Sequence, residues 1–440
     1  MKKILMFAMV ALFMGSCQNE DASSADSSFS MKASAADYPV SAYPDTTERY
    51  CGDITTNTTW TNDKVWEICG VIRVKNGATL TIEPGTYIKG LYMGTGIASG
   101  ILVITKTGRI NAQGTATAPI IFTSYKLLDG NLNTTASPGD LGGIVILGDA
   151  EVNNGLTTNV AEGLGDQLGI SEFYYGGSNN AHNAGILSYV RIEFAGRILD
   201  VGNEVNSLTL AGVGSGTVIN HVQASYGLDD SFEFFGGTVN ATHLVSFAPQ
   251  DDNFDFDLGY TGTITKAIAL ADSNSSHSFS GTPPNYMPDS NGIELDNNAT
   301  GTVTALITRP VISQMSIIGV SSSTVADLYE NGIHVRRAGS ISLIDVTVTG
   351  YNTGIRWESP SIPANSSRSR ISIHGFDNVV LPVGTTISGI GTSISTTDPA
   401  PRWGLAQPFF NDGALDLTGN TGAFKTEALW TNNWTKFTNF

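Results

Sequence analysis

The sequence predicts an all-β fold, a right-handed parallel β-helix (β-solenoid) with about 22 residues per coil and a cap at each end. The 440 residues include 49 glycines, and short apolar runs alternate with turns rich in glycine, asparagine and aspartate. Amphipathic helical stretches are almost absent. An internal repeat adds to this pattern, because the segment 221–242 matches the segment 243–264 when it is shifted by about 22 residues.

The repeat brings residues of the same kind into register. The matched pairs are His221 with His243, Asp229-Asp230 with Asp251-Asp252, Phe232 with Phe254, and Glu233 with Asp255. Residues 331–334 match residues 353–356 at the same spacing. A single coil of this length cannot bury its inward face, so we expect coils to stack around one continuous apolar core. The twist of parallel strands favours the right-handed form.

The expected strands follow one another along the chain as short runs of β-branched and apolar residues. Examples are residues 71–74, 80–82, 101–104, 142–147 and 189–192. Longer polar stretches at 127–140, 153–184 and 272–289 are expected to be loops that leave the coils. Nothing marks a domain boundary, so residues 46–440 are expected to form one domain.

The N-terminus is expected to be a targeting segment rather than part of the fold. Residues 1–16 carry two lysines and then an apolar run, as a signal peptide does. Gly15-Ser16-Cys17 resembles the bacterial lipobox, with Met14 where that motif usually has leucine. The resemblance implies cleavage before Cys17, lipidation of its thiol, and a flexible tether over residues 17–45. The alternative is an ordinary signal peptide that a cysteine follows by coincidence.

Residues 18–21 read Gln-Asn-Glu-Asp, and this acidic stretch resembles the surface-export signal of Bacteroidetes lipoproteins. The resemblance implies a membrane anchor and display at the cell surface, on the outer membrane; retention in the periplasm is the alternative. The net charge of −17 excludes nucleic acid as a partner, since such binding needs a basic surface. The charge favours cations, neutral glycans, or polyanions held through a bridging metal.

Both ends of the solenoid need a cover, because open ends expose strand edges. Cys51 and Cys69 both lie near the start of a chain expected to be exported, so we expect a disulfide that closes a cap at about 50–70. Two buried free thiols are the alternative. A tryptophan-rich tail at about 400–440, with Trp430 and Trp434, is expected to cap the other end.

The repeat also predicts a ladder of carboxylates. Equivalent residues of stacked coils lie about 4.8 Å apart, and bare carboxylates at that distance repel unless a cation relieves them. Calcium prefers several carboxylates together with carbonyl and water oxygens. The expected calcium ligands are Asp229, Asp251, Asp252 and Asp255, with Asp230, Glu233 and Asp257 as an outer or second set. An exposed acidic ribbon without metal is the alternative.

The segment 251–256 resembles the Asp-Asp-Gly-Trp-Asp calcium motif of the family nine pectate lyases, which are right-handed β-helices. In those enzymes an aspartate one coil earlier completes the site, and Asp229 matches it. Their catalytic base is a lysine in an Asn-Gly-Phe-Lys segment. Here that segment reads Asn-Gly-Ile-Glu, so Glu294 replaces the lysine and is a weak candidate for a catalytic residue. The resemblance therefore implies calcium binding more than lyase activity.

Over its whole length the chain resembles a group of Bacteroidetes β-helix lipoproteins of the cell surface. Residues 82–86, 229–237 and 422–434 carry this resemblance, which implies a fold and a location but no particular activity. We expect a calcium-binding module that binds a polysaccharide or docks on an outer-membrane protein. A polysaccharide lyase or glycoside hydrolase that acts on an acidic polysaccharide is the alternative, and a structural or adhesive role is a further one.

Overall fold

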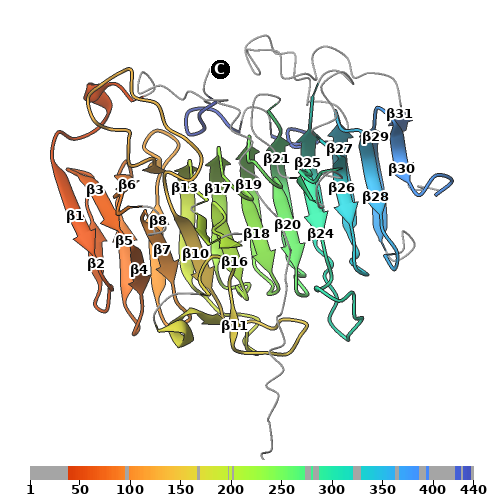
Figure 1. Cartoon of the computed structure of the whole chain (residues 1–440), viewed down its shortest axis with the longest axis horizontal. Coiled ribbons are helices and arrows are strands. Elements are labelled where there is room, and N and C mark those ends of the chain that lie inside the picture. Colours follow the sequence, from red (N-terminus) through yellow and green to blue (C-terminus); the bar gives the residue numbers. More distant parts are fainter. Residues whose placement is uncertain are drawn as a thin grey trace, which may run out of the picture.

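A computed structural model describes residues 38–94, 99–165, 169–196, 198–200, 203–272, 279–280, 287–320, 329–361, 366–385, 393–395, 422–427 and 430–437. The strands stack coil upon coil along one axis, so the expected all-β parallel β-helix is confirmed (Figure 1). The signal peptide, Cys17 and most of the tether lie outside the described residues. No helix of the described part has the length and hydrophobicity to cross a bilayer.

Two long parallel sheets form the walls of the solenoid. Sheet II has ten strands among the described residues, and all of its neighbours pair in parallel. Its strands are β4 (Val71–Val74), β7 (Ile101–Ile104), β10 (Gly143–Leu147), β16 (Leu208–Ala211), β18 (Phe232–Phe235), β20 (Phe254–Asp257), β24 (Ile293–Leu295), β26 (Asn331–Val335), β28 (Thr353–Trp357) and β30 (Asn378–Leu381).

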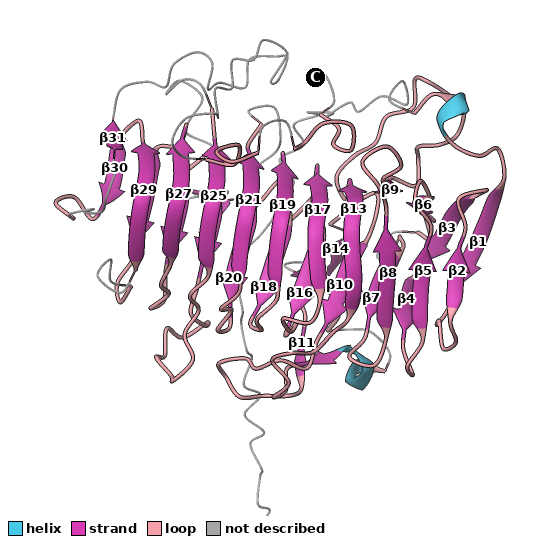
Figure 2. Ribbon diagram, turned by 180° about the vertical axis from the view of Figure 1, so that it is seen from behind, coloured by secondary structure: helices cyan, strands magenta, loops and turns pink. Residues whose placement is uncertain are grey.

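Sheet I has 15 strands in the described part of the chain, and Figure 2 shows its long members side by side. They are β1 (Thr47–Cys51), β2 (Thr58–Trp60), β3 (Val65–Cys69), β5 (Thr79–Ile82), β6 (Tyr87–Gly90), β8 (Arg109–Gln113), β9 (Ile120–Thr123), β13 (Gly185–Glu193), β17 (Val218–Ser225), β19 (Asn240–Phe247), β21 (Thr263–Leu270), β25 (Val311–Ile318), β27 (Ser342–Thr349), β29 (Ser367–His374) and β31 (Ser393–Ser395).

The long strands of sheet I are bent in the middle. β13 pairs with β8 through its first half and with β9 through its second half. One long strand thus takes the place of two shorter strands of the preceding coil. Tyr189 stands between the halves with a φ of 51°, in the left-handed region. In the next two coils, His221 and His243 repeat this backbone conformation with φ values of 52° and 57°. In these coils, a left-handed residue at a fixed register therefore turns the chain from one face of the solenoid to the next.

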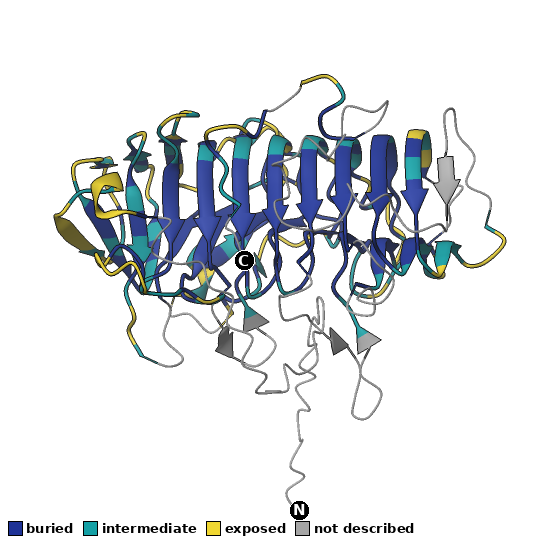
Figure 3. Ribbon diagram, turned by 90° about the horizontal axis from the view of Figure 1, so that it is seen from above, coloured by how far each residue is buried: buried dark blue, intermediate teal, exposed yellow. Residues whose placement is uncertain are grey.

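The core lies between the sheets and follows from strict alternation along each strand. In β18, Phe232 and Phe234 point inward, and they stack on Phe254 and Phe256 of β20 with ring centroids 5.0 Å apart. Figure 3 shows that the strands of the middle coils are buried along most of their length. The residues between these phenylalanines must face outward, and in this part of sheet II they are the acidic ones.

The coils keep the period of the sequence repeat only where no loop interrupts them. Phe232 pairs with Phe254 at the spacing of the repeat, whereas Asp255 pairs with Glu294, which lies much further along the chain. The extra residues lie between β21 and β24, where a loop was expected. The described part of this stretch includes a short antiparallel pair, β22 (Phe279–Ser280) and β23 (Met287–Pro288). The stacking order survives the insertion because each new strand still pairs with the preceding coil.

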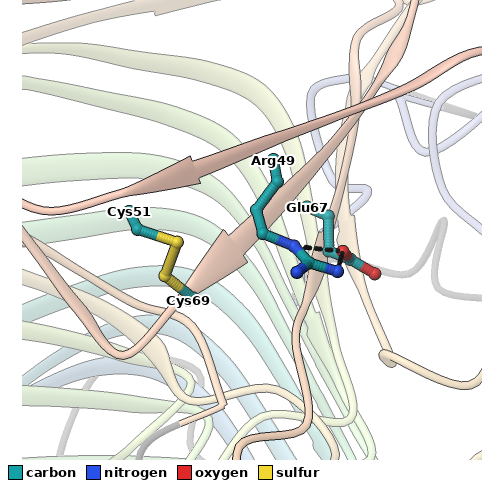
Figure 4. Close-up of a disulfide and its surroundings, with 4 residues drawn as sticks. All are labelled: Arg49, Cys51, Glu67 and Cys69. Atoms are coloured by element: carbon teal, nitrogen blue, oxygen red, sulfur yellow. Dashed lines mark hydrogen bonds and ion pairs between the residues drawn. A yellow bond between two sulfur atoms is a disulfide. The ribbon is translucent and has the colours of Figure 1, made fainter.

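At the N-terminal end, β1 lies beside β3 with Cys51 directly opposite Cys69, and the two cysteines form a disulfide (Figure 4). Arg49 and Glu67 form an ion pair of 2.8 Å across the same two strands. The described residues of this segment are strands that belong to the first coils of sheet I. β1 is the terminal strand of sheet I, and most of its residues are exposed.

The described part of the tryptophan-rich tail differs from the expected cap. Trp430 and Trp434 lie on the outer face of sheet I over the middle coils, against the rings of His221 and His243. The physical reason is that these outward rings offer an aromatic surface on which the tryptophans can be buried. The indole N–H groups of Trp430 and Trp434 donate to the carbonyls of Ala423 and Trp430 within the tail itself.

Candidate metal centre

The outward face of sheet II brings acidic residues of successive coils into one column. Glu233 of β18 lies opposite Asp255 of β20, which lies opposite Glu294 of β24. The predicted register of Glu233 and Asp255 is therefore present in the structure. The column continues through His334 of β26 to Arg356 of β28, so its charge changes from negative to positive along the solenoid axis.

A second row of carboxylates lies in the turns before these strands. The backbone N–H of Asp252 donates to Oδ1 of Asp230 at 2.8 Å, and the N–H of Asn291 donates to Oδ1 of Asp252 at 2.5 Å. Each aspartate thus accepts a hydrogen bond from the backbone of the next coil. This stacking fixes the carboxylates in place, because moving one would leave a buried backbone donor without its acceptor.

The carboxylates gather in two overlapping clusters. Oxygen atoms of Asp229, Asp230 and Asp251 lie within 4.8 Å of one another, and so do oxygen atoms of Asp230, Glu233 and Asp255. Asp230 belongs to both clusters, although the sequence placed it only in the outer set. All of these side chains are buried, with exposed fractions of 8% or less. The arrangement is a compact acidic site rather than an exposed ribbon.

Two of the predicted residues lie at the edges of this site. The carboxylate of Asp252 faces the following coil, where it receives the Asn291 amide and the charge of Glu294. Asp257 lies one outward position further along β20, where burial and then the neighbouring charge of Asp296 raise its pKa well above the usual value. The structure therefore brings five of the seven predicted ligands together and places the other two beside them.

Two further carboxylates, which the sequence did not reveal, face the same site. Burial raises the pKa of Glu162 well above its usual value, and the charges of Asp229 and Glu204 raise it further. Glu162 lies in a loop and Glu204 ends the short strand β15 (Asn203–Glu204); both stand between β10 and β16, outside the repeat. The loop that carries Glu162 is held on the outer face of sheet II by Leu164, Phe173 and Tyr175, which are buried in an apolar cluster there. The sequence repeat could not reveal these two residues, because neither belongs to a strand of the coils.

The electrostatics of the site are those of crowded and dehydrated acids. Burial raises the pKa of Asp229 to about 7, and the charge of Glu204 adds to this. Burial is also the main cause of the raised pKa values of Asp230 and Glu233, followed by neighbouring carboxylates. The side-chain N–H of Asn206 donates to Glu233, but a neutral donor leaves the negative charge in place. A bound cation would compensate it.

Glu294 lies at the border between the acidic site and a group of arginines. Arg336 forms ion pairs with Glu294 and, at 2.9 Å, with Asp296, which also binds Arg337 at 2.5 Å. Burial raises the pKa of Glu294, and the Arg336 guanidinium acts in the opposite direction. Glu294, which the sequence motif matches to the lysine base of the family nine lyases, is therefore a buried carboxylate held by an arginine.

Comparison with protein families agrees with the fold. Residues 52–435 match the family model described as a pectate-lyase like beta helix domain. The chain belongs to this family. No curated protein sequence matches the chain.

Solved structures of similar proteins include pectate lyase Pel9A, with a TM-score of 0.35 and 11% identity over 85% of this chain and 84% of that one. Another is the A-module of the mannuronan C-5 epimerase AlgE6 of Azotobacter vinelandii. Its TM-score is 0.17 and its identity 9%, over 83% of this chain and 93% of that one. At these scores neither structure informs the site of this member of the pectate-lyase-like family.

Proposed function

We propose that this member of the pectate-lyase-like β-helix family is a calcium-binding module that binds an acidic polysaccharide at the cell surface. The observation that carries the proposal is the pair of overlapping carboxylate clusters around Asp230, which are buried and crowded at a fixed register. Calcium takes six to eight oxygen ligands. Three carboxylates per cluster leave positions for water or for oxygens of a bound ligand.

Family membership and charge together support a polysaccharide as the ligand. The chain carries a net charge of −17, so an acidic polymer needs a bridging cation in order to approach this face. Calcium in the clusters would supply that bridge and would couple ligand binding to metal binding. The arginines at the C-terminal side of the column, Arg336 and Arg356, are already ion-paired with acidic neighbours, which makes them weaker partners for a ligand carboxylate.

Among the described residues, Glu294 is poorly suited to act as the base of a lyase. Abstraction of a proton next to a uronate carboxylate needs a positioned base, and Glu294 is engaged by Arg336. A glycoside hydrolase is the second candidate, since a raised pKa of the kind found at Asp229 is what a general acid requires. In that case Asp229 would protonate the leaving oxygen while a second carboxylate of the cluster acted as base or nucleophile.

Anchoring is the remaining part of the proposal. Lipidation at Cys17 would hold the module on the outer membrane, and the tether would set the solenoid at a distance from the lipid surface. A polysaccharide outside the cell would then meet the acidic face directly.

The test is binding and turnover measured on the same polymers. Polygalacturonate, alginate and neutral glycans are presented to the purified chain in calcium and in chelator, by affinity electrophoresis and by assay for unsaturated and reducing products. We expect calcium-dependent retention by an acidic polymer, no unsaturated uronate, and no new reducing ends. Calcium-dependent release of unsaturated uronates would overturn the module in favour of a lyase, and new reducing ends would favour the hydrolase.

A further inference from the structure

We propose a second metal site, made of Asp289, Glu294 and His334, that binds a divalent transition-metal ion such as Zn²⁺. The site lies one coil beyond the acidic clusters and differs from them in containing an imidazole. It goes beyond the proposed function, which requires only the calcium clusters.

The three residues come together through strand pairing. Glu294 of β24 and His334 of β26 lie directly opposite each other, and Asp289 lies in the turn that leads into β24. One potential ligand atom from each residue lies within 4.8 Å of the other two. Glu294 and His334 are buried, with exposed fractions of 5% and 3%, whereas Asp289 is half-buried and borders the surface. An ion could therefore reach a largely buried site from the side of Asp289.

The state of His334 is the second observation that points to a metal. Its Nε2 lies 3.2 Å from Oε1 of Glu358, within ion-pair distance. Both ring nitrogens are buried, and neither has a hydrogen-bond partner among the described residues. Histidines that bind metal usually direct their second ring nitrogen at a carboxylate, which orients the ring and makes the ligand nitrogen more basic. Glu358 is the carboxylate near enough to Nε2 to take that role once the ring binds a metal through Nδ1. A buried ring nitrogen without a partner is otherwise unfavourable, and a metal ion would satisfy it.

The surrounding charges are arranged so that Glu294 is not fully neutralised by arginine. Arg336 divides its ion pairs between Glu294 and Asp296, and Asp296 also takes Arg337. Arg356 pairs with Glu330 and Glu358. Arg336 binds Oε1 of Glu294, and the side-chain N–H of Asn291 lies 3.4 Å from Oε2, so a metal ion would bind this carboxylate beside two donors. One imidazole and two carboxylates favour zinc or a similar transition ion, whereas the clusters around Asp230 offer oxygen alone and favour calcium.

Binding of Zn²⁺ to the full chain in saturating calcium tests the site, because calcium occupies the acidic clusters and leaves the mixed site for zinc. Calorimetric titration of the wild type should give saturable binding of one zinc ion per chain. His334→Gln should abolish it and should leave the calcium-dependent shift in melting temperature unchanged. Asp251→Asn with Asp252→Asn should have the opposite effects, so that failure of the zinc site and failure of the calcium site are distinguishable.

Matched variants separate ligation from folding. Glu358→Gln keeps the three ligands and removes the supporting carboxylate, so zinc affinity should fall about 10- to 100-fold. His374→Gln changes another buried histidine, on β29, and should leave zinc binding intact. If His334→Gln does not fold, Asp289→Asn replaces the half-buried ligand and should weaken zinc binding instead. Equal zinc affinity in the wild type and in the folded ligand variant, or no saturable zinc in the wild type, would overturn the proposal.

Discussion

At the scale of single residues, Asp251 of one acidic cluster and Asp252 at its edge test whether the site binds calcium. We predict that calcium at a hundredfold excess over its Kd stabilises the wild type by about 2.7 kcal/mol. The double change Asp251→Asn and Asp252→Asn should abolish this increment, because asparagine keeps an oxygen for the Asn291 amide but supplies no charge for calcium. Thermal unfolding in calcium and in chelator measures the difference between the two proteins.

The same variant has an expected effect in the absence of metal. Removing two charges from a crowded, buried site relieves repulsion, so the double variant should unfold no more easily than the wild type in chelator. Asp345→Asn is the matched control, since Asp345 is also buried but pairs with Arg370 and Lys425. That change should lower stability equally with and without calcium. An identical melting temperature of the wild type in calcium and in chelator would exclude the site.

How much of the site could be predicted depends on where each residue lies. Glu233 and Asp255 were found by register because no loop interrupts the coil between them. His334 joins the same column after a much longer interval from Glu294, which hides the register, and nothing in the sequence marked it as a ligand. Glu162 and Glu204 lie in connecting segments, whose residues reach the site through packing rather than through the repeat.

At the scale of structural elements, residues 422–427 and 430–437 form a strap that contacts several coils. It follows a column of left-handed residues on sheet I, namely Tyr189, His221, His243, Lys266, Gln314 and Asp345, whose φ values lie between 51° and 58°. Lys425 pairs with Asp345, and the hydroxyl of Thr426 donates to Gln314 at 2.6 Å. The left-handed bend turns these side chains out of the coils, so that the described parts of the strap contact successive coils. Lys425 reaches β27, Thr426 reaches β25 and Glu427 reaches β21.

The histidines beneath the strap predict a dependence of stability on pH. Burial, followed by the charge of His243, lowers the pKa of His221 to about 4, and burial also lowers that of His243. An unfolded histidine titrates near a pH of about 6.5, so between that pH and about 4 the unfolded chain binds more protons than the folded one. Protonation of these two histidines in the unfolded chain should therefore lower the free energy of unfolding as the pH decreases through that window.

A variant isolates that contribution from the many carboxylates that titrate nearby. The double variant His221→Gln and His243→Gln removes both imidazole rings and their ionisation. Lys266 and Glu427 keep their ion pair beside the strap. The melting temperature of this variant should change less between pH 6.5 and 4 than that of the wild type, although its value at neutral pH should be lower because the stacked rings are lost. Parallel pH profiles of the two proteins would show that the pair does not titrate on unfolding.

For the whole molecule, the fold could be predicted because a solenoid repeats one local rule. Alternation within a strand and stacking between coils place Phe232 over Phe254 wherever the period is intact. The position of the tail could not be predicted in this way. Trp430 and Trp434 are large apolar residues that could be buried either at an open end of the solenoid or on an outer face, and the sequence does not distinguish the two. That choice depended on His221 and His243, which the bend directs outward.

Anchoring is the prediction that concerns the molecule as a whole. If Cys17 carries acyl chains, each buried methylene adds about 0.8 kcal/mol to membrane binding, and several chains together hold the protein firmly. Cys17→Ser removes the attachment point and leaves the solenoid unchanged, so the variant should move from the membrane fraction to the soluble fraction. Protease added to intact cells should digest the wild type if residues 18–21 direct it outward. Protection of the wild type on intact cells, with digestion only after the outer membrane is opened, would instead place the module in the periplasm.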